Sequence, residues 1–495
     1  MTKTHYLNLL LLPAFFLLHN NNVLFGFMLW QQVLIFISIT TLLTIACFFL
    51  LKKLLKVAPV AALATLLVQL FILFFGPFHD FIKSVAAGSV VSSYKVVVPV
   101  IIILTGLLTR YFFKNKETVI KFSRSAFTVL LVLCIYEITV SGINLYNLSA
   151  NKNLIYPQQP VCDSYTSCNL PDSSKPDIYF LVLDEYTNNN TLQKLWNFEN
   201  IDVTNWLTAN GFYVIPRSHA NYTSTSFSVS STLNMNYISK KNSKGTIRNY
   251  LRSNKSLSYN ETFCLLQKEG YTIRFLAPYK NDIEKNGLID YTGYMHNNWL
   301  FMHTFFGRFN RDILWHFRTG RFAFRKEEPG SEIVPWSKRR ENIRKTIDKI
   351  KATADLREHT PKFVYGHLMI THDPHVFDST GAARKEDTSK PFDTYTQQII
   401  YANTVIKDLV SHIRRNNKKN TVIIIEGDHG FRLFPVEMKE YFFPNFSAVY
   451  FPDSIYHQLY PGMSPVNTFR VVFNHYFCQN LPLLKDSSIL ITDYD

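Results

Sequence analysis

Long apolar segments in the first 150 residues are the feature that most constrains this chain of 495 residues. Four of them reach the length of about 17–25 residues that a helix needs to cross a bilayer, and the first segment is shorter. The segments lie at residues 6–18, 27–51, 57–78, 90–108 and 126–145. Because a backbone inside lipid must satisfy its own hydrogen bonds, we expect a bundle of about five transmembrane helices.

Basic residues are concentrated in alternate connections between these segments. Lys52, Lys53 and Lys56 follow the second segment, and a second basic group lies between the fourth and fifth segments. The positive-inside rule places both connections in the cytoplasm. Everything after residue 145 then lies outside the cytoplasm, whether or not segment 6–18 crosses the membrane.

The net charge of +15 does not indicate a nucleic-acid partner. Residues 1–150 hold 11 Lys and Arg against 3 Asp and Glu, so about half of the excess belongs to the membrane half. The rest fits a domain that faces anionic lipid or a phosphorylated substrate. No Arg/Gly-rich tail and no zinc-finger spacing are present, so we expect no nucleic acid as a partner.

Composition divides the chain into three parts. We predict a multi-pass transmembrane domain at residues 1–146, a polar and proline-rich linker at 147–176, and a soluble catalytic domain at 177–495. Cys162 and Cys168 are candidates for a disulfide if the linker is extracytoplasmic. Glu137 lies within the last apolar segment, where a carboxylate is either functional or paired between helices.

Two apolar strands are predicted to end in acidic residues. Residues 177–186 read DIYFLVLDEY, and residues 421–432 read TVIIIEGDHGFR. Open α/β sheets bind their ligands at the carboxyl ends of the strands, so two such strands can bring their acids to one metal ion. A polar turn after each strand is the alternative. The candidate ligands are Asp184, Glu185, Asp428 and His429.

Two further polar motifs lie between these strands. Residues 219–237 are rich in Ser and Thr and include Thr225 at the predicted start of a helix, where such residues act as caps or favour an anion. A strand at residues 363–370 is followed by a Thr-His-Asp-Pro-His run that contains His372. An amphipathic helix at 393–415 then leads into the last strand, which predicts a doubly wound α/β domain.

The order of these motifs resembles that of the alkaline phosphatase superfamily, in its sulfatase-like branch. Apolar spans followed by such a domain are also similar to membrane-bound lipoteichoic acid synthases and phosphoethanolamine transferases. The motifs cover roughly residues 176–480, and residues 1–150 resemble these proteins in topology alone. The resemblance implies an α/β fold, with an N-terminal bundle of about five transmembrane helices and an alkaline-phosphatase/sulfatase-like doubly wound domain. It also implies a bacterial inner-membrane location with the catalytic domain in the periplasm.

The resemblance implies a centre for one divalent metal ion. Asp428 and His429 match the metal-binding Asp-His pair of the family, and either Asp184 or Glu185 matches its acidic ligand. The Thr225 oxygen is a further ligand by the same resemblance. Mixed carboxylate, imidazole and hydroxyl ligands suit manganese, zinc or magnesium and do not choose between them.

The resemblance also implies two catalytic residues. Thr225 matches the nucleophilic threonine of the transferases because Ser228 stands three residues later, as in those enzymes, and Thr223 is the nearest rival. His372 matches the histidine that contacts the transferred phosphate or the leaving group. A metal nearby would lower the pKa of the threonine hydroxyl and activate it.

The expected activity is transfer of a phosphoethanolamine- or phosphoglycerol-type headgroup from a membrane lipid donor to an envelope glycan or lipid acceptor. The chain lacks the C/S-x-P-x-R motif that sulfatases need for formylglycine, which disfavours sulfate-ester hydrolysis by that route. A phosphate or sulfate ester hydrolase of the same fold is one alternative. A non-catalytic envelope assembly protein is another.

Overall fold

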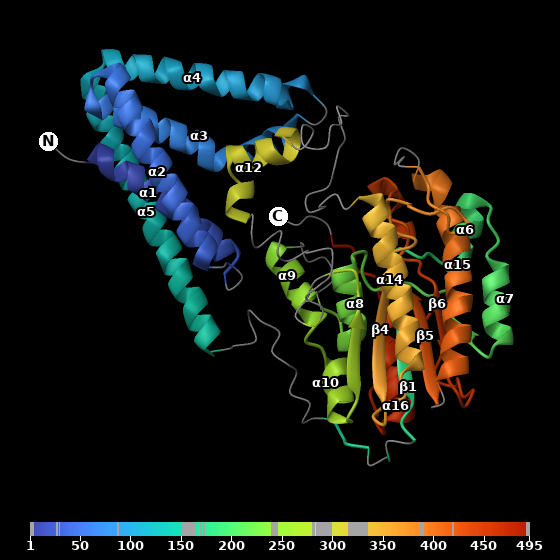
Figure 1. The fold of residues 1–495 in the computed structure, drawn as a ribbon. Coiled ribbons are helices and arrows are strands. Elements are labelled where there is room, and N and C mark those ends of the chain that lie inside the picture. The colour runs from blue at the N-terminus through green and yellow to red at the C-terminus, as the bar shows by residue number, and fades with distance from the viewer. Residues whose placement is uncertain are drawn as a thin grey trace. The chain divides into compact units, whose positions relative to one another are not determined.

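The computed structural model forms two compact units, which we describe separately (Figure 1). The first comprises Met1–Ile155 and Gly293–Gly330, and the second comprises Tyr156–Thr292 and Ser331–Asp495. The residues that the structure describes are 4–25, 28, 30–86, 89–150, 165–168, 171, 174–238, 246–279, 283, 299–314, 335–385, 391–417 and 420–491.

The first unit is built from long apolar helices, coloured blue to teal in Figure 1. They are α1 (Thr4–Val23), α2 (Trp30–Leu55), α3 (Ala58–Val85), α4 (Tyr94–Lys114) and α5 (Lys116–Ala150), with the short η1 (Val90–Ser92) before α4. Within α2 to α5, four helical stretches are long and apolar enough to cross a membrane. The predicted N-terminal bundle is confirmed, and α1, which contains segment 6–18, is not among those four stretches.

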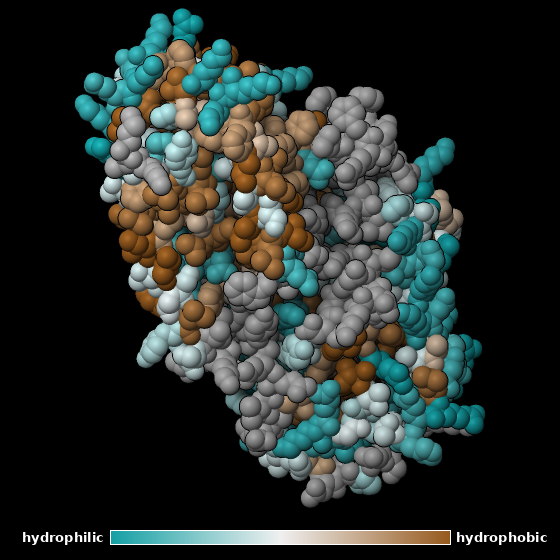
Figure 2. All heavy atoms as spheres, turned by 60° about the vertical axis from the view of Figure 1, so that its left-hand side comes forward, coloured by the Kyte–Doolittle hydropathy of each residue, from teal (hydrophilic) through white to brown (hydrophobic). Residues whose placement is uncertain are grey.

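Large apolar side chains cover the outside of this helical unit. Leu34, Leu42, Ile102, Leu107 and Val132 are examples of such exposed residues on α2, α4 and α5. Figure 2 shows hydrophobic side chains gathered over these helices. An exposed apolar surface of this kind is the expected lipid-facing side of a membrane bundle.

A segment distant in sequence packs within the same helical unit. Residues 299–314 include α12 (Phe305–Phe309) and η4 (Asn310–Leu314). The Phe305 ring contacts the rings of Phe71 and Phe75, and the Gly76 N–H donates to the His303 carbonyl at 2.9 Å. These residues fall inside the range expected for the soluble domain, yet their contacts join them to α3. Residues 278–335, which are rich in aromatic and basic side chains, otherwise lie largely outside the described part of the chain.

The second unit is organised around one six-stranded sheet in the order β2-β6-β5-β1-β4-β3. Strands β5, β1, β4 and β3 run parallel, and β6 and β2 add an antiparallel edge. Parallel strands joined by helical crossovers confirm the predicted α/β fold class. The strands are β1 (Asp177–Leu183), β2 (Tyr213–Val214), β3 (Thr272–Leu276), β4 (Lys362–Leu368), β5 (Thr421–Gly427) and β6 (Ser447–Tyr450).

Helices cover both faces of the sheet. One face packs against α7 (Ile201–Ala209), α14 (Trp336–Asp355) and α15 (Pro391–Asn416). The other packs against α8 (Thr225–Asn234), α10 (Glu261–Lys268) and α16 (Thr468–Tyr476). The remaining elements are α6 (Asn189–Trp196), α9 (Ile247–Ser256), η5 (Val436–Phe442) and η6 (Pro465–Asn467).

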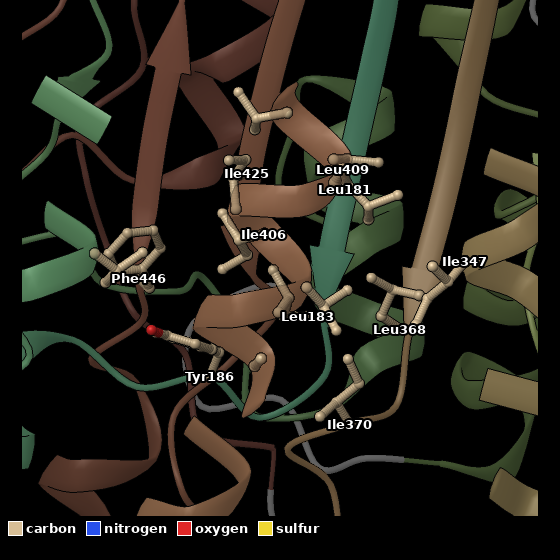
Figure 3. Close-up of a cluster of buried hydrophobic side chains, with 14 of the residues drawn as sticks. Leu181, Leu183, Tyr186, Ile347, Leu368, Ile370, Ile406, Leu409, Ile425 and Phe446 are labelled. Atoms are coloured by element: carbon tan, nitrogen blue, oxygen red, sulfur yellow. The ribbon is translucent and has the colours of Figure 1, made fainter. Parts of the chain in front are cut away.

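The central strand β1 alternates its side chains between two apolar cores. Leu181 and Leu183 join the first core, whereas Phe180 and Val182 join the second. Figure 3 shows Leu181 and Leu183 among side chains from α15 and β5 in the first core. Each fully buried side chain of this size stabilises the fold by about 1.5–3 kcal/mol. The packed sheet therefore holds the residues that follow its strands in fixed positions.

A disulfide joins Cys168 to Cys478, 310 residues apart in the sequence. The expected pairing of Cys168 with Cys162 is therefore wrong, and Cys162 itself lies outside the described residues. Spacing in the sequence favoured the near neighbour, but the fold brings the end of α16 to the polar segment before β1. A disulfide of this kind is typical of an oxidising, extracytoplasmic compartment.

Candidate metal centre

Parallel register brings the acids after β1 and β5 side by side. Leu183, the last residue of β1, pairs with Gly427, the last residue of β5, so Asp184 and Asp428 directly follow neighbouring strand ends. A Cβ atom at Gly427 would lie 2.2 Å from the Tyr186 carbonyl oxygen, so only glycine permits this approach. The sequence pattern of two strands ending in acid thus becomes one cluster.

Hydrogen bonds hold the Asp428 carboxylate in one orientation. Its Oδ1 accepts the backbone N–H groups of Glu185 and His429, both at 3.0 Å. Its Oδ2 has no hydrogen-bond partner among the described residues and lies 3.4 Å from His429 Nε2. The carboxylate is therefore fixed by one oxygen and presents the other.

The His429 ring is oriented in the same way. Its Nδ1 lies 2.9 Å from the Gly430 carbonyl oxygen. Because a carbonyl oxygen only accepts, Nδ1 carries the proton and Nε2 presents its lone pair. Burial, together with nearby Arg432, lowers the pKa of His429 to about 4, against the opposing effect of Asp428 and Asp184. The imidazole is thus neutral near pH 7, which is the form that binds a metal.

Asp184 completes the cluster from β1. Its Oδ1 lies 3.5 Å from His429 Nε2, and within the described parts of the chain it has no hydrogen-bond partner. Its Oδ2 lies 3.1 Å from His367 Nε2. Burial alone would raise the pKa of Asp184, but His372, His367 and His429 lower it well below its usual range. The carboxylate is therefore ionised and has one oxygen available.

Three polar atoms that are buried and lack partners in the described structure converge here. Asp184, Asp428 and His429 are each at most 3% exposed. Leaving such atoms unsatisfied costs free energy, and a bound cation would satisfy all three of them together. Two carboxylate oxygens and an imidazole nitrogen are donors that suit a divalent transition metal or magnesium. The residues present fit the metal that the resemblance implies.

His367 in β4 was not among the residues predicted from sequence. Ligand atoms of Asp184, His367 and Asp428 all lie within 4.8 Å of one another. His367 Nδ1 lies 2.8 Å from the Tyr365 hydroxyl, which lies 2.7 Å from the Tyr279 hydroxyl. A histidine inside an apolar strand next to β1 was the available signal, but its partner becomes visible only with the strand register.

Glu185 lies apart from Asp184 despite being next to it in sequence. Its backbone has a φ of 65°, in the left-handed region, which turns its side chain toward a different group. Its Oε1 accepts the Arg432 N–H at 2.7 Å, and its ligand atoms cluster with those of His372 and Asp373. Burial raises the pKa of Glu185 to about 7, against the effect of His372 and Arg432. As a metal ligand, Glu185 stays a prediction.

Thr225 is the first residue of α8, which begins beside the cluster. One turn later, the Ser228 hydroxyl donates to the Asp428 carbonyl oxygen, which ties this helix to the strand end. The Thr223 carbonyl oxygen accepts a hydrogen bond from Arg432 at 3.1 Å. Thr225 is half-buried, and in the described structure no hydrogen bond joins its hydroxyl to the acids. Its roles as nucleophile and ligand stay predictions.

His372 follows β4 and is flanked by two arginines. Its Nε2 lies 3.4 Å from Arg432 Nη2, and its carbonyl oxygen accepts a hydrogen bond from Arg339 at 3.1 Å. Burial would lower the pKa of His372, but Asp184, Asp373 and Glu185 raise it overall. The predicted catalytic histidine thus lies between anionic and cationic groups, and its catalytic role stays a prediction.

A protein-family model described as Sulfatase matches residues 196–472, which is more than half of the chain. No curated protein gives a significant match. The match bears out the resemblance read from the motif order.

Several solved structures are similar to this chain at low sequence identity. The integral membrane protein lipooligosaccharide phosphoethanolamine transferase A from Neisseria meningitidis is 12% identical, with a TM-score of 0.39, over 96% of this chain and 95% of that one. The zinc complex of the C-terminal periplasmic domain of EcEptC from Escherichia coli is 12% identical, with a TM-score of 0.39, over 63% and 85%. The corresponding EptC domain from Campylobacter jejuni is 13% identical, with a TM-score of 0.37, over 61% and 89%.

Proposed function

We propose that this chain, which belongs to the sulfatase family, is a membrane-anchored metalloenzyme that transfers a phospho-headgroup from a lipid donor to an envelope acceptor. The transferred group is of the phosphoethanolamine or phosphoglycerol type. Thr225 is the nucleophile in this proposal. The active domain faces the periplasm of a bacterial cell.

The observation that carries the proposal is the convergence of Asp184 Oδ1, Asp428 Oδ2 and His429 Nε2 without partners in the described structure. These three residues would hold one divalent ion, with the Thr225 oxygen and Glu185 as further candidate ligands. When bound, the ion would withdraw charge from the phosphoryl group and lower the pKa of a nearby hydroxyl. Manganese, zinc and magnesium all suit this set of donors.

The chain's own residues then supply two displacements. Thr225 reacts as its Oγ1 alkoxide, which the second displacement regenerates. This oxygen forms a bond to phosphorus while the bond from phosphorus to the lipid glycerol oxygen breaks. His372, which the surrounding carboxylates favour in its protonated form, gives a proton to that leaving oxygen. An acceptor hydroxyl next attacks the phospho-threonine, returns a proton to His372 and releases Thr225.

A lipid donor is favoured by the membrane unit of the same chain. Four of its helices are long and apolar enough to span a bilayer, and its exposed surface is apolar. The Cys168–Cys478 disulfide agrees with a soluble unit outside the cytoplasm. A donor held in the outer half of the bilayer is the phosphodiester that such an enzyme meets first.

The proposal is tested with the purified full chain in detergent micelles that contain mass-labelled phosphatidylethanolamine or phosphatidylglycerol. We expect diacylglycerol release, with a phospho-adduct on Thr225. Thr225→Ala should lose turnover by about 10⁴-fold and lose the adduct, because nothing replaces the nucleophile. Thr223→Ala is the matched control, since it removes the rival hydroxyl from the same loop.

Each outcome separates the candidate functions. Equal turnover in Thr225→Ala and wild type would exclude Thr225 as the nucleophile. Free inorganic phosphate or sulfate as the product would identify a hydrolase instead. A wild-type protein without bound metal and without turnover would favour the non-catalytic envelope protein.

A further inference from the structure

We infer that Arg432 is an anion-binding residue, whose guanidinium contacts the oxyanion of the phosphate-ester substrate between Thr225 and His372. The inference concerns the site of the proposed function and rests on it. Nothing in the sequence motifs marked this arginine, which stands four residues after Asp428.

Two contacts place the Arg432 guanidinium between His372 and the segment that precedes Thr225. Its Nη1 donates to the Thr223 carbonyl oxygen at 3.1 Å, two residues before Thr225. Its Nη2 lies 3.4 Å from His372 Nε2. One planar cation therefore spans the distance from the start of α8 to the imidazole. A group transferred from a lipid to Thr225 with help from His372 must occupy the same region.

Arg432 contacts Glu185 through its backbone and, at longer range, through its side chain. Its backbone N–H, rather than its side chain, makes the short hydrogen bond of 2.7 Å to Glu185 Oε1. The side-chain Nε remains 4.0 Å from that oxygen, beyond hydrogen-bond distance. The Arg432 side chain as a whole is 33% exposed, so an incoming ligand can reach it.

The chemistry of this position suits a phosphoryl oxyanion. A guanidinium stays charged at all physiological pH values and presents N–H groups in a plane that matches two oxygens of one phosphate. It cannot act as an acid or base here, so its contribution is electrostatic. Positive charge fixed where the transition state develops negative charge is a large part of phosphoryl-transfer catalysis.

Arg339 on α14 has a different part in the same arrangement. Its Nη2 donates to the His372 carbonyl oxygen at 3.1 Å and lies 3.4 Å from His372 Nδ1. It acts through the histidine and is a positioning residue. Together the two arginines place positive charge on both sides of the His372 ring.

The test measures anion binding to the metal-loaded full chain by calorimetry, so it does not depend on turnover. The probes are inorganic phosphate, dimethyl phosphate and inorganic sulfate. We expect Arg432→Ala to weaken the Kd for phosphate and dimethyl phosphate roughly 10- to 100-fold, which is the effect of losing a charged hydrogen-bonded pair. Arg432→Lys should recover part of this loss, because it keeps the charge without the planar pair of donors.

The control is Arg414→Ala. Arg414 also donates to a backbone carbonyl, that of Asn210. It lies near the C-terminus of α15, just before β5 begins, whereas Arg432 follows the end of β5. The loss of Arg414 should leave all anion affinities unchanged. Metal content is measured in parallel, and Arg432→Ala should retain it.

Two results would overturn the inference. One is an unchanged phosphate Kd in Arg432→Ala, including the case in which that variant loses only metal or thermal stability, as a structural brace would. The other is a wild-type protein that binds none of the three anions. If anion binding depends on Arg432 but lipid substrates are not turned over, the inference stands and the proposed function fails. Tighter binding of sulfate than of either phosphate would keep the anion site but reject a phosphate ester.

Discussion

Each unit of the molecule buries a carboxylate beside an imidazole, and the two pairs differ in what they leave unsatisfied. In the helical unit, Glu137 Oε1 lies 2.8 Å from His19 Nδ1, and Oε2 accepts the Asn22 amide at 2.7 Å. In the soluble unit, the cluster of Asp184, Asp428 and His429 keeps three atoms without partners in the described structure. The Glu137 carboxylate is thus fully hydrogen-bonded within the protein, whereas the second cluster has three atoms that a bound cation would satisfy.

Glu137 is a carboxylate paired between two helices. Glu137 in an apolar helix was either a functional residue or a carboxylate paired between helices. Both of its oxygens have partners on α1, and Ser141 Oγ extends the network to Asn22 Oδ1 at 2.8 Å. These contacts join α1 to α5 and describe a paired carboxylate. The location of Glu137 in a membrane segment was therefore a weaker guide to its function than the hydrogen bonds made by its two carboxylate oxygens.

The largest effect on metal binding should come from a change in the cluster of Asp184, Asp428 and His429. Asp428→Asn keeps the oxygen that accepts the Glu185 and His429 N–H groups but removes the charge at the other position. We expect metal affinity to fall at least about 100-fold and lipid turnover on the order of 10³-fold, because the metal-binding charge is lost. Calorimetric metal titration and diacylglycerol release measure the two effects. The metal-free variant should be no less stable than the metal-free wild type, since it relieves repulsion with Asp184.

A smaller effect, on stability rather than on metal binding, should come from the hydrogen-bonded pair of Glu137 and His19. Glu137→Ala removes both acceptor oxygens and leaves His19 and Asn22 without them, at a cost of about 3 kcal/mol in stability. Glu137→Gln is the matched control, because its amide can still bond both neighbours. The readout is the temperature at which a fluorogenic maleimide labels the buried thiol of Cys134 on α5, measured in a Cys47→Ser background because Cys47 is also a free thiol.

Glu137→Ala should expose the Cys134 thiol at a lower temperature than wild type, while Glu137→Gln should not. Turnover per metal-loaded molecule should change less than about twofold in both variants, since the pair has no free atoms to offer a substrate. A selective loss of turnover in a stable Glu137→Gln protein would show that the pair of Glu137 and His19 is functional, and the comparison would fail.

The smallest effect should come from the residue that orients the cluster. His367→Gln can keep a hydrogen bond to Asp184 Oδ2, but it removes the ring nitrogen that contacts the Tyr365 hydroxyl. We expect a metal Kd weaker by about 10- to 100-fold, as is typical when a residue that orients a metal ligand is lost. Complete loss of metal would instead show that His367 is itself a ligand. A metal Kd equal to that of wild type would show that His367 has no part in metal binding.

The sequence was a good guide wherever the chemistry is local. Apolar runs predicted the helices and the parallel strands, and acids directly after two of those strands predicted that Asp184 and Asp428 would meet. The family match then agreed with the motif order. Local pattern and burial were enough for these features because each depends on a few consecutive residues.

The features that the sequence did not reveal depend on register and on turns between distant segments. His367 reaches Asp184 only because β4 pairs with β1. The separation of Asp184 from Glu185 follows from one left-handed residue, which no composition signals. The Cys168–Cys478 disulfide and the contact of Arg432 with Thr223 join parts of the chain hundreds of residues apart.

The most direct test of the metal centre is the metal content of the purified full chain, measured by elemental mass spectrometry beside Asp428→Asn and Glu137→Gln. We predict one equivalent of a divalent metal in wild type and in Glu137→Gln, and less than about a tenth of an equivalent in Asp428→Asn. Equal metal content in Asp428→Asn and wild type, or none in any of the three, would contradict the centre formed by Asp184, Asp428 and His429.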